Sequence, residues 1–273
     1  MEVYKLEPFQ QNNESFLTLT NWKSIQPSLQ VGFTTRLGGI SESPFQSFNL
    51  GLHVPDNEQD IIENRKLLAK RLGIPIENWV SGEQVHATNI AITGDTDKGK
   101  GALSYSESLP NIDGLITNQK GVLCTAFYAD CVPLFFFDPD SGYIGIAHAG
   151  WKGTVDRIGA KMIEKLEKVG ANIQTLKVAI GPCISKSAYQ VDDHVIKNLT
   201  AKQRDHTTKK QANNHYLLDL KKLNVEILLQ SGILRHNIEI TNYCTFRDKE
   251  MFFSHRRDHG KTGRMLGFIG FQS

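Results

Sequence analysis

The stretch VLCTAFYADCVPLFFFDPDSGYIGIAHAGWKGT, residues 122–154, decides the predicted fold. It contains three apolar runs, 122–129, 132–137 and 143–149, and short polar segments separate them. Continuous apolar runs of this length favour strands that are covered on both faces. Their close succession predicts hairpin-like neighbours in one sheet. The glycines that follow the third run indicate a tight turn that opens a helix at about Thr154.

Helical periodicity predicts three helices. Between 57 and 72 the apolar residues recur along one face, Asn57 or Asp56 can cap the first turn, and Gly73 ends the helix. The same periodicity predicts a second helix over 154–169 and a third over about 218–230. The polar segment 201–215 is predicted to be a surface excursion inside the fold and not a linker.

Strands and helices alternate irregularly along the chain. The strand at 143–149, the helix at 154–169 and the run at 176–181 predict one strand–helix–strand unit. Other β-prone apolar runs lie at 31–35, 114–117, 238–241 and 265–271. We therefore predict a single-domain, mixed-sheet α/β or α+β layered fold over residues 1–273.

Composition excludes several classes of protein. Of 273 residues, 40% are apolar and 22% are charged, which is typical of a globular chain and excludes disorder. Thirty-one Lys plus Arg against 29 Asp plus Glu leave too little net charge for a nucleic-acid coat or a polybasic membrane anchor. The N-terminal residues lack the pattern of a secretory signal, and the four cysteines form no CxxC pair. We expect a cytoplasmic protein with free thiols.

Three short motifs each place one soft metal ligand beside turn residues. They are GEQVH ending at His86, ADC ending at Cys131, and AHAGWKG containing His148. Imidazole and thiolate suit zinc or copper far better than magnesium or calcium. Three protein ligands leave one coordination position open, which permits catalysis. Taken singly, each histidine also fits a satisfied polar residue, and Cys131 also fits a small buried hydrophobe or a nucleophile.

Other residues are candidates for holding an anion or assisting the metal. Arg36 lies on a Gly-Gly loop, Asn49 precedes a glycine, and Lys152 lies at the start of the predicted second helix. Asp113 opens the strand at 114–117 and can add a carboxylate to the same rim, although an Asp-Gly pair by itself also fits an ordinary turn. The loop SHRRDHGKTGR, residues 254–264, can close over an anionic substrate or remain a solvated charge run.

Taken in order, the motifs resemble one protein family. TTRLGG, GEQVH, DGLIT, ADCVPL, AHAGWKG, IGPCI and RRDHGKTGRMLGFI look like the laccase-domain proteins, also called multicopper polyphenol oxidases and purine nucleoside phosphorylases. The resemblance runs from about Val31 to the C-terminus. It implies a four-layer α/β/β/α fold and a zinc ion bound by His86, Cys131 and His148, which also form the catalytic set.

The resemblance also implies substrates. Phosphate would cleave the N-glycosidic bond of adenosine, inosine or S-methyl-5′-thioadenosine, with adenosine deamination as a further activity. Arg36 and Asn49 are carried over as substrate or phosphate contacts, and Lys152 is added as an anion contact. Cys183 in the GPCI motif stays unassigned, either as a fourth ligand or as a strand-end cysteine.

Copper is the alternative metal. The chain has nine histidines and no His-x-His pair, which disfavours a multicopper centre. A single His₂Cys copper site would need an axial ligand such as methionine, and none of Met1, Met162, Met251 and Met265 lies near the motifs in sequence.

Three hypotheses follow: a zinc-dependent phosphorylase, a cytoplasmic amidohydrolase that edits peptidoglycan precursors, and a non-enzymatic protein with structural zinc. Laccase activity ranks below the phosphorylase.

Overall fold

Two six-stranded sheets pack face to face in the computed structural model, which describes residues 6–272. The first sheet has, in spatial order, β1 (Phe9–Gln11), β2 (Phe16–Leu19), β3 (Leu29–Thr34), β15 (Met265–Phe271), β7 (Leu123–Tyr128) and β4 (Trp79–Ser81). The second has β14 (Ile238–Ile240), β10 (Lys177–Ile180), β8 (Val132–Phe137), β9 (Ile144–Ala149), β6 (Gly114–Thr117) and β5 (Ile90–Ile92). Each sheet combines antiparallel and parallel pairs.

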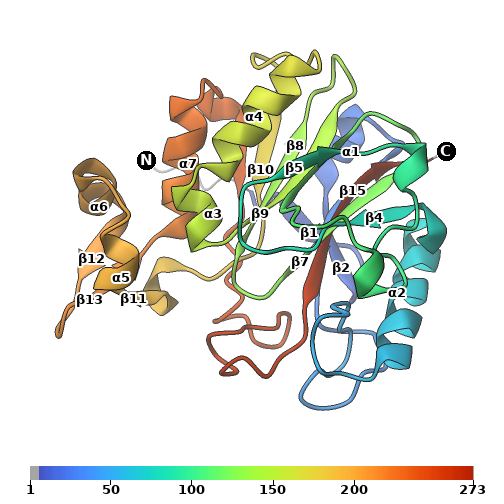
Figure 1. Cartoon of the computed structure of the whole chain (residues 1–273), viewed down its shortest axis with the longest axis horizontal. Coiled ribbons are helices and arrows are strands. Elements are labelled where there is room, and N and C mark those ends of the chain that lie inside the picture. The colour runs from blue at the N-terminus through green and yellow to red at the C-terminus, as the bar shows by residue number, and fades with distance from the viewer. Residues whose placement is uncertain (1–5, 273) are drawn as a thin grey trace.

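Helices cover the outer faces of both sheets (Figure 1). The helices are α1 (Thr20–Ile25), α2 (Glu58–Leu72), α3 (Trp151–Val155), α4 (Ile158–Lys168), α5 (Asp193–Ile196), α6 (Ala201–Thr207) and α7 (Leu220–Gln230). On one side, Leu68 of α2 packs in a cluster with Phe268 of β15. On the other side, Leu166 of α4 and Ile227 of α7 pack in a cluster with Leu134 of β8. The predicted mixed, four-layer α/β/β/α fold is therefore confirmed.

Strand β8 is buried on both faces, which explains why its sequence is apolar throughout. Leu134 and Phe136 belong to the cluster beneath α4 and α7, whereas Phe135 and Phe137 belong to the cluster between the two sheets. Burying a large apolar side chain contributes roughly 1.5–3 kcal/mol, so a strand buried on both faces gains at every residue. The predicted strand covered on both faces is confirmed.

The hairpin-like succession predicted over 122–149 is half wrong. Strands β8 and β9 pair in antiparallel register, with Pro133 opposite His148. Strand β7 does not pair with β8; it lies in the other sheet between β15 and β4. Asp130 adopts a left-handed backbone with φ of 88° and turns the chain from one sheet to the other. This change of sheet puts Cys131 at the edge between the layers.

The predicted helices are largely confirmed. Asn57 caps α2 by accepting from the backbone N–H of Gln59, and Gly73 ends it in the left-handed region. Helix α7 begins after Asp219, whose side chain accepts from the backbone N–H of Lys222. The helix predicted over 154–169 is instead two helices, α3 and α4, because Arg157 between them has a left-handed φ of 63°.

The polar segment 201–215 is more structured than predicted. It contains α6 and β12 (Thr208–Lys210), and β12 pairs with β13 (His215–Leu218), which also pairs with β11 (Gln190–Asp192). This small sheet projects beside α3 and α7 (Figure 1). Within residues 6–272, no helix has the length and apolar character that crossing a lipid bilayer requires.

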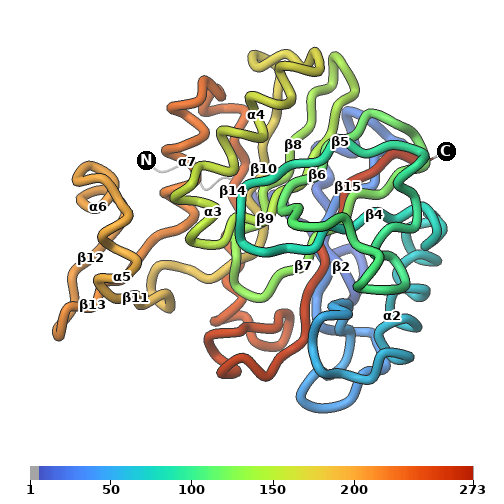
Figure 2. The backbone as a smooth tube through the Cα atoms, viewed as in Figure 1, coloured from blue at the N-terminus to red at the C-terminus, as the bar shows by residue number. Residues whose placement is uncertain are grey.

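Two segments far apart in sequence lie side by side at one end of the molecule. They are the 36–57 connection and the 245–264 connection, blue and red in the tube view (Figure 2). Arg36 donates from its backbone N–H to the carbonyl of Met251, and Leu50 donates to the carbonyl of Arg264. The N-terminal and C-terminal connections thus jointly close this end of the layered body.

Candidate metal centre and its cavity

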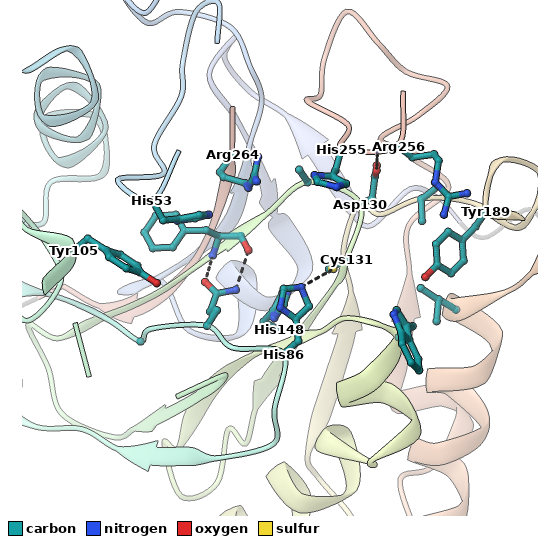
Figure 3. Close-up of a pocket in the computed structure, with 17 residues that line it drawn as sticks. His53, His86, Tyr105, Asp130, Cys131, His148, Tyr189, His255, Arg256 and Arg264 are labelled. Atoms are coloured by element: carbon teal, nitrogen blue, oxygen red, sulfur yellow. Dashed lines mark hydrogen bonds between the residues drawn. The ribbon is translucent and has the colours of Figure 1, made fainter. Parts of the chain in front are cut away.

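The structure brings His86, Cys131 and His148 together. Their ligand atoms all lie within 4.8 Å of one another, and 4.0 Å separates the Cys131 Sγ from the His86 Nε2 (Figure 3). His86 follows β4, Cys131 joins β7 to β8, and His148 lies in β9. Among the described residues, this is the group of three or more His, Cys, Asp or Glu side chains arranged to hold a metal ion.

Local backbone geometry lets the three side chains approach. His86 has a left-handed φ of 62°, which is uncommon for a residue with a side chain. Gly150 leaves the space that the ligands occupy, because a Cβ there would lie 2.9 Å from His86 Cδ2 and 3.2 Å from Cys131 Sγ. The glycine of the AHAGWKG motif is therefore needed for the cluster as well as for the turn.

One carboxylate orients two of the ligands. Asp113 Oδ1 accepts a hydrogen bond from His148 Nδ1 at 2.8 Å, which leaves His148 Nε2 for the cluster. The same carboxylate accepts the backbone N–H groups of Val85, His86 and Ala87 at 3.2, 3.1 and 2.9 Å. Carboxylate partners of this kind fix the tautomer and direction of metal-binding histidines. Asp113 thus holds one ligand by its ring and another by its backbone.

Charges in the cluster favour the thiolate form of Cys131, which binds metal, whereas His148 has to release a proton to become a ligand. Burial raises the pKa of the Cys131 thiol, but the charge and hydrogen bonds of His148 and His86 outweigh burial and lower that pKa to about 6. Burial lowers the pKa of His148, but Cys131 and Asp113 outweigh it and raise that pKa to about 9. Near neutral pH the metal-free protein therefore pairs a thiolate with an imidazolium.

The donor set fits a transition metal. Two imidazoles and one thiolate are borderline to soft ligands, which zinc and copper accept, and three ligands leave an open position. None of the methionines was predicted near the ligands, and Met162, Met251 and Met265 do not line the cavity at the cluster; Met1 lies outside the described residues. Cys183 is not in the cluster either; it is buried and forms an isolated β-bridge with Cys244.

A cavity of about 460 Å³ opens in front of the cluster. Its walls carry aromatic rings and cationic groups on both sides of the three ligands (Figure 3). The aromatic and imidazole residues are His53, Tyr105, Phe127, Trp151, Tyr189 and His255, and the guanidinium groups are those of Arg256 and Arg264. Three of these residues belong to the basic loop 254–264, so this loop does reach the cavity.

Several residues that line the cavity were not predicted from the sequence. His53 and Tyr189 lie in connections and Tyr105 begins a short 3-10 helix, Tyr105–Glu107; none belongs to a recognised motif, and nothing in the sequence pattern identifies them. Trp151 had a signal, because it follows Gly150 directly in the AHAGWKG motif. Gln84 of the GEQVH motif also lines the cavity, and its side-chain amide exchanges hydrogen bonds of 2.9 and 2.7 Å with the backbone of Phe127.

The predicted anion contacts lie behind or outside the cavity lining. Arg36 donates through Nε and Nη2 to the carbonyl of Gln46 at 3.0 and 2.9 Å. Asn49 is buried, and its Oδ1 accepts the backbone N–H of Arg264 at 2.9 Å. Lys152 is exposed on α3 beside the Trp151 ring. A substrate contact by any of the three stays a prediction.

Known proteins resemble this chain over nearly its whole length. Residues 30–272 match the family model described as multi-copper polyphenol oxidoreductase laccase. The chain is 42% identical over 271 residues to purine nucleoside phosphorylase YlmD of Bacillus subtilis strain 168, which covers 97% of this chain and 98% of that protein.

Solved structures share the fold. A crystal structure of hypothetical protein YfiH from Bacillus licheniformis gives a TM-score of 0.94 at 40% identity. The match covers 98% of this chain and 100% of that one. A crystal structure of YlmD from Geobacillus stearothermophilus gives a TM-score of 0.93 at 38% identity, with coverage of 98% and 100%.

Proposed function

The chain belongs to the multi-copper polyphenol oxidoreductase laccase family, and from this membership and its site we propose that it is a zinc-dependent purine nucleoside phosphorylase. The substrates proposed are adenosine, inosine and S-methyl-5′-thioadenosine with inorganic phosphate. Relatives of the family that are similar to this chain carry the phosphorylase name. The observation that carries the proposal is the open His86, Cys131 and His148 cluster at one wall of a cavity that is large enough for a nucleoside.

In this reaction an oxygen of phosphate bonds to C1′ of the ribose while the bond from C1′ to N9 of the purine breaks. The electron pair of that bond goes to the purine, which then takes a proton. The other product is ribose 1-phosphate from adenosine or inosine, and 5-methylthioribose 1-phosphate from S-methyl-5′-thioadenosine. Catalysis therefore requires a place for the anion, a place for the flat base, and stabilisation of charge on the departing purine.

A zinc ion at the cluster would act as a Lewis acid toward the purine, or would acidify water for adenosine deamination. The chain's own groups have separate tasks. Asp113 orients His148 and the 85–87 backbone, so the ligand set is preorganised. The aromatic walls formed by Trp151, Tyr189 and Tyr105 offer faces against which a purine can pack.

Zinc is preferred to copper for two reasons. Within the described chain no methionine lines the cavity to serve as a weak axial ligand. A multicopper centre also needs many more histidines than the two in the cluster. Adenosine deamination is proposed as a side activity only, because the chain lacks the His-x-Glu and Cys-x-x-Cys pattern of zinc deaminases.

The test is a nucleoside panel incubated with the zinc-loaded protein, with and without phosphate, and analysed by mass. We expect inosine to give hypoxanthine and ribose 1-phosphate only when phosphate is present. Loss of inosine at the same rate without phosphate would contradict phosphorolysis. Adenosine in phosphate-free buffer tests the deaminase activity separately, through the appearance of inosine.

The Cys131 thiolate beside the His148 imidazolium favours one alternative function. A thiolate paired with an imidazole is also the arrangement of a cysteine amidohydrolase. That activity would release an amino acid from a peptidoglycan precursor and leave free nucleosides intact.

We also propose that residues 1–273 act as one cytoplasmic domain.

A further inference from the structure

The two sides of the cavity differ in how their cations are held. His53 and Arg264 lie on one side of the cluster, and Arg256 and Tyr189 lie on the other (Figure 3). Arg256 is exposed, donates through Nη1 to the carbonyl of Gln190 at 2.7 Å, and stacks at 5.1 Å from the Tyr189 ring centroid. Arg264 is only partly exposed, and its Nη1 donates to the carbonyls of Thr262 and Gly263 at 2.8 and 3.1 Å.

Arg264 keeps donors free for a ligand. In the part of the chain that the structure describes, its Nε and Nη2 make no hydrogen bond and no carboxylate lies within 4.0 Å of its guanidinium. Two hydrogen bonds fix its backbone. Asn49 Oδ1 accepts its backbone N–H, and Leu50 donates to its carbonyl at 3.2 Å. The arginine is therefore held from its backbone while part of its fork stays available.

A second cation adds positive potential on the same side. Arg65 of α2 is fully buried, and its guanidinium donates to the carbonyls of Leu50, Gly101 and Ala102, each at 2.8 Å. It also lies 4.7 Å from the centroid of the Phe127 ring, which lines the cavity. Within residues 6–272 no carboxylate pairs with Arg65 at ion-pair distance. Buried cations without an acidic partner are costly, and a bound anion offsets that cost.

His53 completes the arrangement. A Cβ built on Gly51 would lie 2.7 Å from Arg264 Cγ and 3.3 Å from His53 Cε1, so the stem of Arg264 and the ring of His53 both pack beside Gly51, and both residues line the cavity. Burial, followed by the charges of Arg264 and Arg65, lowers the pKa of His53 to about 4. His53 is thus a neutral imidazole that can donate one hydrogen bond beside a fixed guanidinium.

The acidic group that faces this side does not compete for Arg264. Asp130 lines the cavity, but its carboxylate already accepts from Thr245 Oγ1 at 2.6 Å, Ser254 Oγ at 3.0 Å and the backbone N–H of Arg256 at 2.7 Å. These hydrogen bonds of Asp130 hold the 245–256 segment on the side of the cavity where Arg256 lies. An oxyanion beside Arg264 would therefore meet donors and positive charge.

We propose that Arg264 and His53 form the phosphate subsite of this cavity, with Gly51 and Asn49 as the positioning residues behind it. The assignment rests on the proposed phosphorylase function for the role of the anion, but the binding of phosphate is testable without turnover. The guanidinium fork binds two phosphate oxygens, and the neutral His53 donates to a third.

The first test is a titration of the zinc-loaded protein with inorganic phosphate alone, followed by phosphorus NMR or calorimetry. Arg264→Met should weaken phosphate binding about 10- to 100-fold, the range for charge-assisted hydrogen bonds to a fixed arginine. Arg264→Lys keeps the charge without the fork and should show a smaller loss. Arg204→Met removes one exposed positive charge on α6, outside the cavity, and should leave phosphate binding unchanged.

The second test is kinetic. With inosine as substrate, Arg264→Met and His53→Ala should raise the KM for phosphate much more than the KM for inosine. Equal phosphate affinity in the wild type and in folded Arg264→Met and Arg264→Lys proteins would overturn the proposal, as would an absence of phosphate binding by the wild type. If phosphate binding falls in the variants but the wild type shows no phosphate-dependent turnover, the subsite stands and the phosphorylase function fails.

Discussion

The two ends of strand β8 carry polar residues that interrupt the same apolar run, and these residues have opposite roles. At its C-terminal end, buried Asp138 accepts hydrogen bonds from Ser141 Oγ at 2.6 Å and Thr175 Oγ1 at 2.7 Å, and the network is closed. At its N-terminal end, Cys131 faces a cavity, and its Sγ lies 4.0 Å from His86 Nε2.

The difference is one of partners and access. Asp138 is bonded to its own turn and to the loop before β10, so its oxygens are used within the scaffold. Cys131 and Asp130 draw their partners from segments 45 residues earlier and 115 residues later. Asp138 uses its oxygens to hold neighbouring segments of the fold together, so its role is stability. Cys131 and Asp130 contact residues from distant segments at the wall of a cavity, so their role is to form the candidate site. Four substitutions test this contrast.

The largest effect is expected from Cys131→Ala, which removes the thiolate that faces the cavity at the N-terminal end of β8. Metal content should fall to background, and inosine turnover should fall by at least about a hundredfold, since even losing an outer-shell partner costs roughly 10- to 100-fold. Metal content and turnover are measured on the same sample. Cys183→Ala removes a buried cysteine outside the cluster and should keep the metal. Full metal occupancy in Cys131→Ala would remove this residue from the ligand set.

The sequence predicts the strands well because their burial is visible in composition. All the apolar runs named from the sequence are strands, since continuous apolarity requires cover on both faces. Pairing was harder. Nothing in ADCV indicates that β7 and β8 join different sheets, because the turn depends on a left-handed Asp130 that tertiary contacts hold in place. The break at Arg157 was missed for a similar reason, because helical periodicity continues across it.

The candidate site divides in the same way. The cluster of His86, Cys131 and His148 was predictable because each ligand lies in a motif beside a turn. The cavity walls were predictable only in part. The loop 254–264 was named from the sequence and lines the cavity, but the sequence does not show that His53 and Arg264, from two distant connections, lie together beside Gly51. Asn49 was predicted as a direct contact, and the structure gives it a hydrogen bond to the backbone of Arg264.

A smaller effect is expected from Asp113→Asn. The amide would retain one acceptor oxygen where the carboxylate now accepts from His148 and from three backbone N–H groups. Zinc affinity should fall about 10- to 100-fold, as for other outer-shell partners of histidine ligands. The measurement is a competition titration against a chelator of known affinity. Asp95→Asn, at an exposed ion pair with Lys98, serves as the matched control. Unchanged zinc affinity would show that the ligands are positioned without Asp113.

Gly51→Ala should have a still smaller effect, confined to the proposed phosphate subsite formed by Arg264 and His53. The new Cβ would lie 2.7 Å from Arg264 Cγ and 2.9 Å from Arg264 Cβ, so the arginine stem has to move. We expect the KM for phosphate to rise about 3- to 10-fold with zinc content unchanged, in line with a modest overpacking cost of roughly 1 kcal/mol. Gly142→Ala is the control, because it strains a left-handed glycine that has nothing within 4 Å. A matching change in the KM for phosphate in both variants would contradict a local effect on Arg264.

The closed end of β8 should show the smallest effect on turnover and a pH-dependent effect on stability. Burial raises the pKa of Asp138, but hydrogen bonds from Ser141, Asn172 and Thr175 outweigh burial and hold that pKa below its usual range. A carboxyl whose pKa is lowered on folding stabilises the protein above its unfolded value of about 3.9. That contribution is lost as the pH falls through the lowered folded value.

Asp138→Asn should therefore lower the free energy of unfolding by about 1–2 kcal/mol at pH 7, because an amide brings donors to groups that all donate. The difference from the wild type should shrink as the pH is lowered below about 4, where the unfolded chain takes up a proton, and should be lost once the pH passes below the lowered pKa of Asp138 in the folded protein. Urea unfolding at several pH values measures this, and inosine turnover at pH 7 should stay at the wild-type level. A loss of turnover comparable to that of Asp113→Asn would mean that the two ends of β8 are coupled. A stability difference that does not change with pH would mean that the Asp138 charge is not what closes this turn.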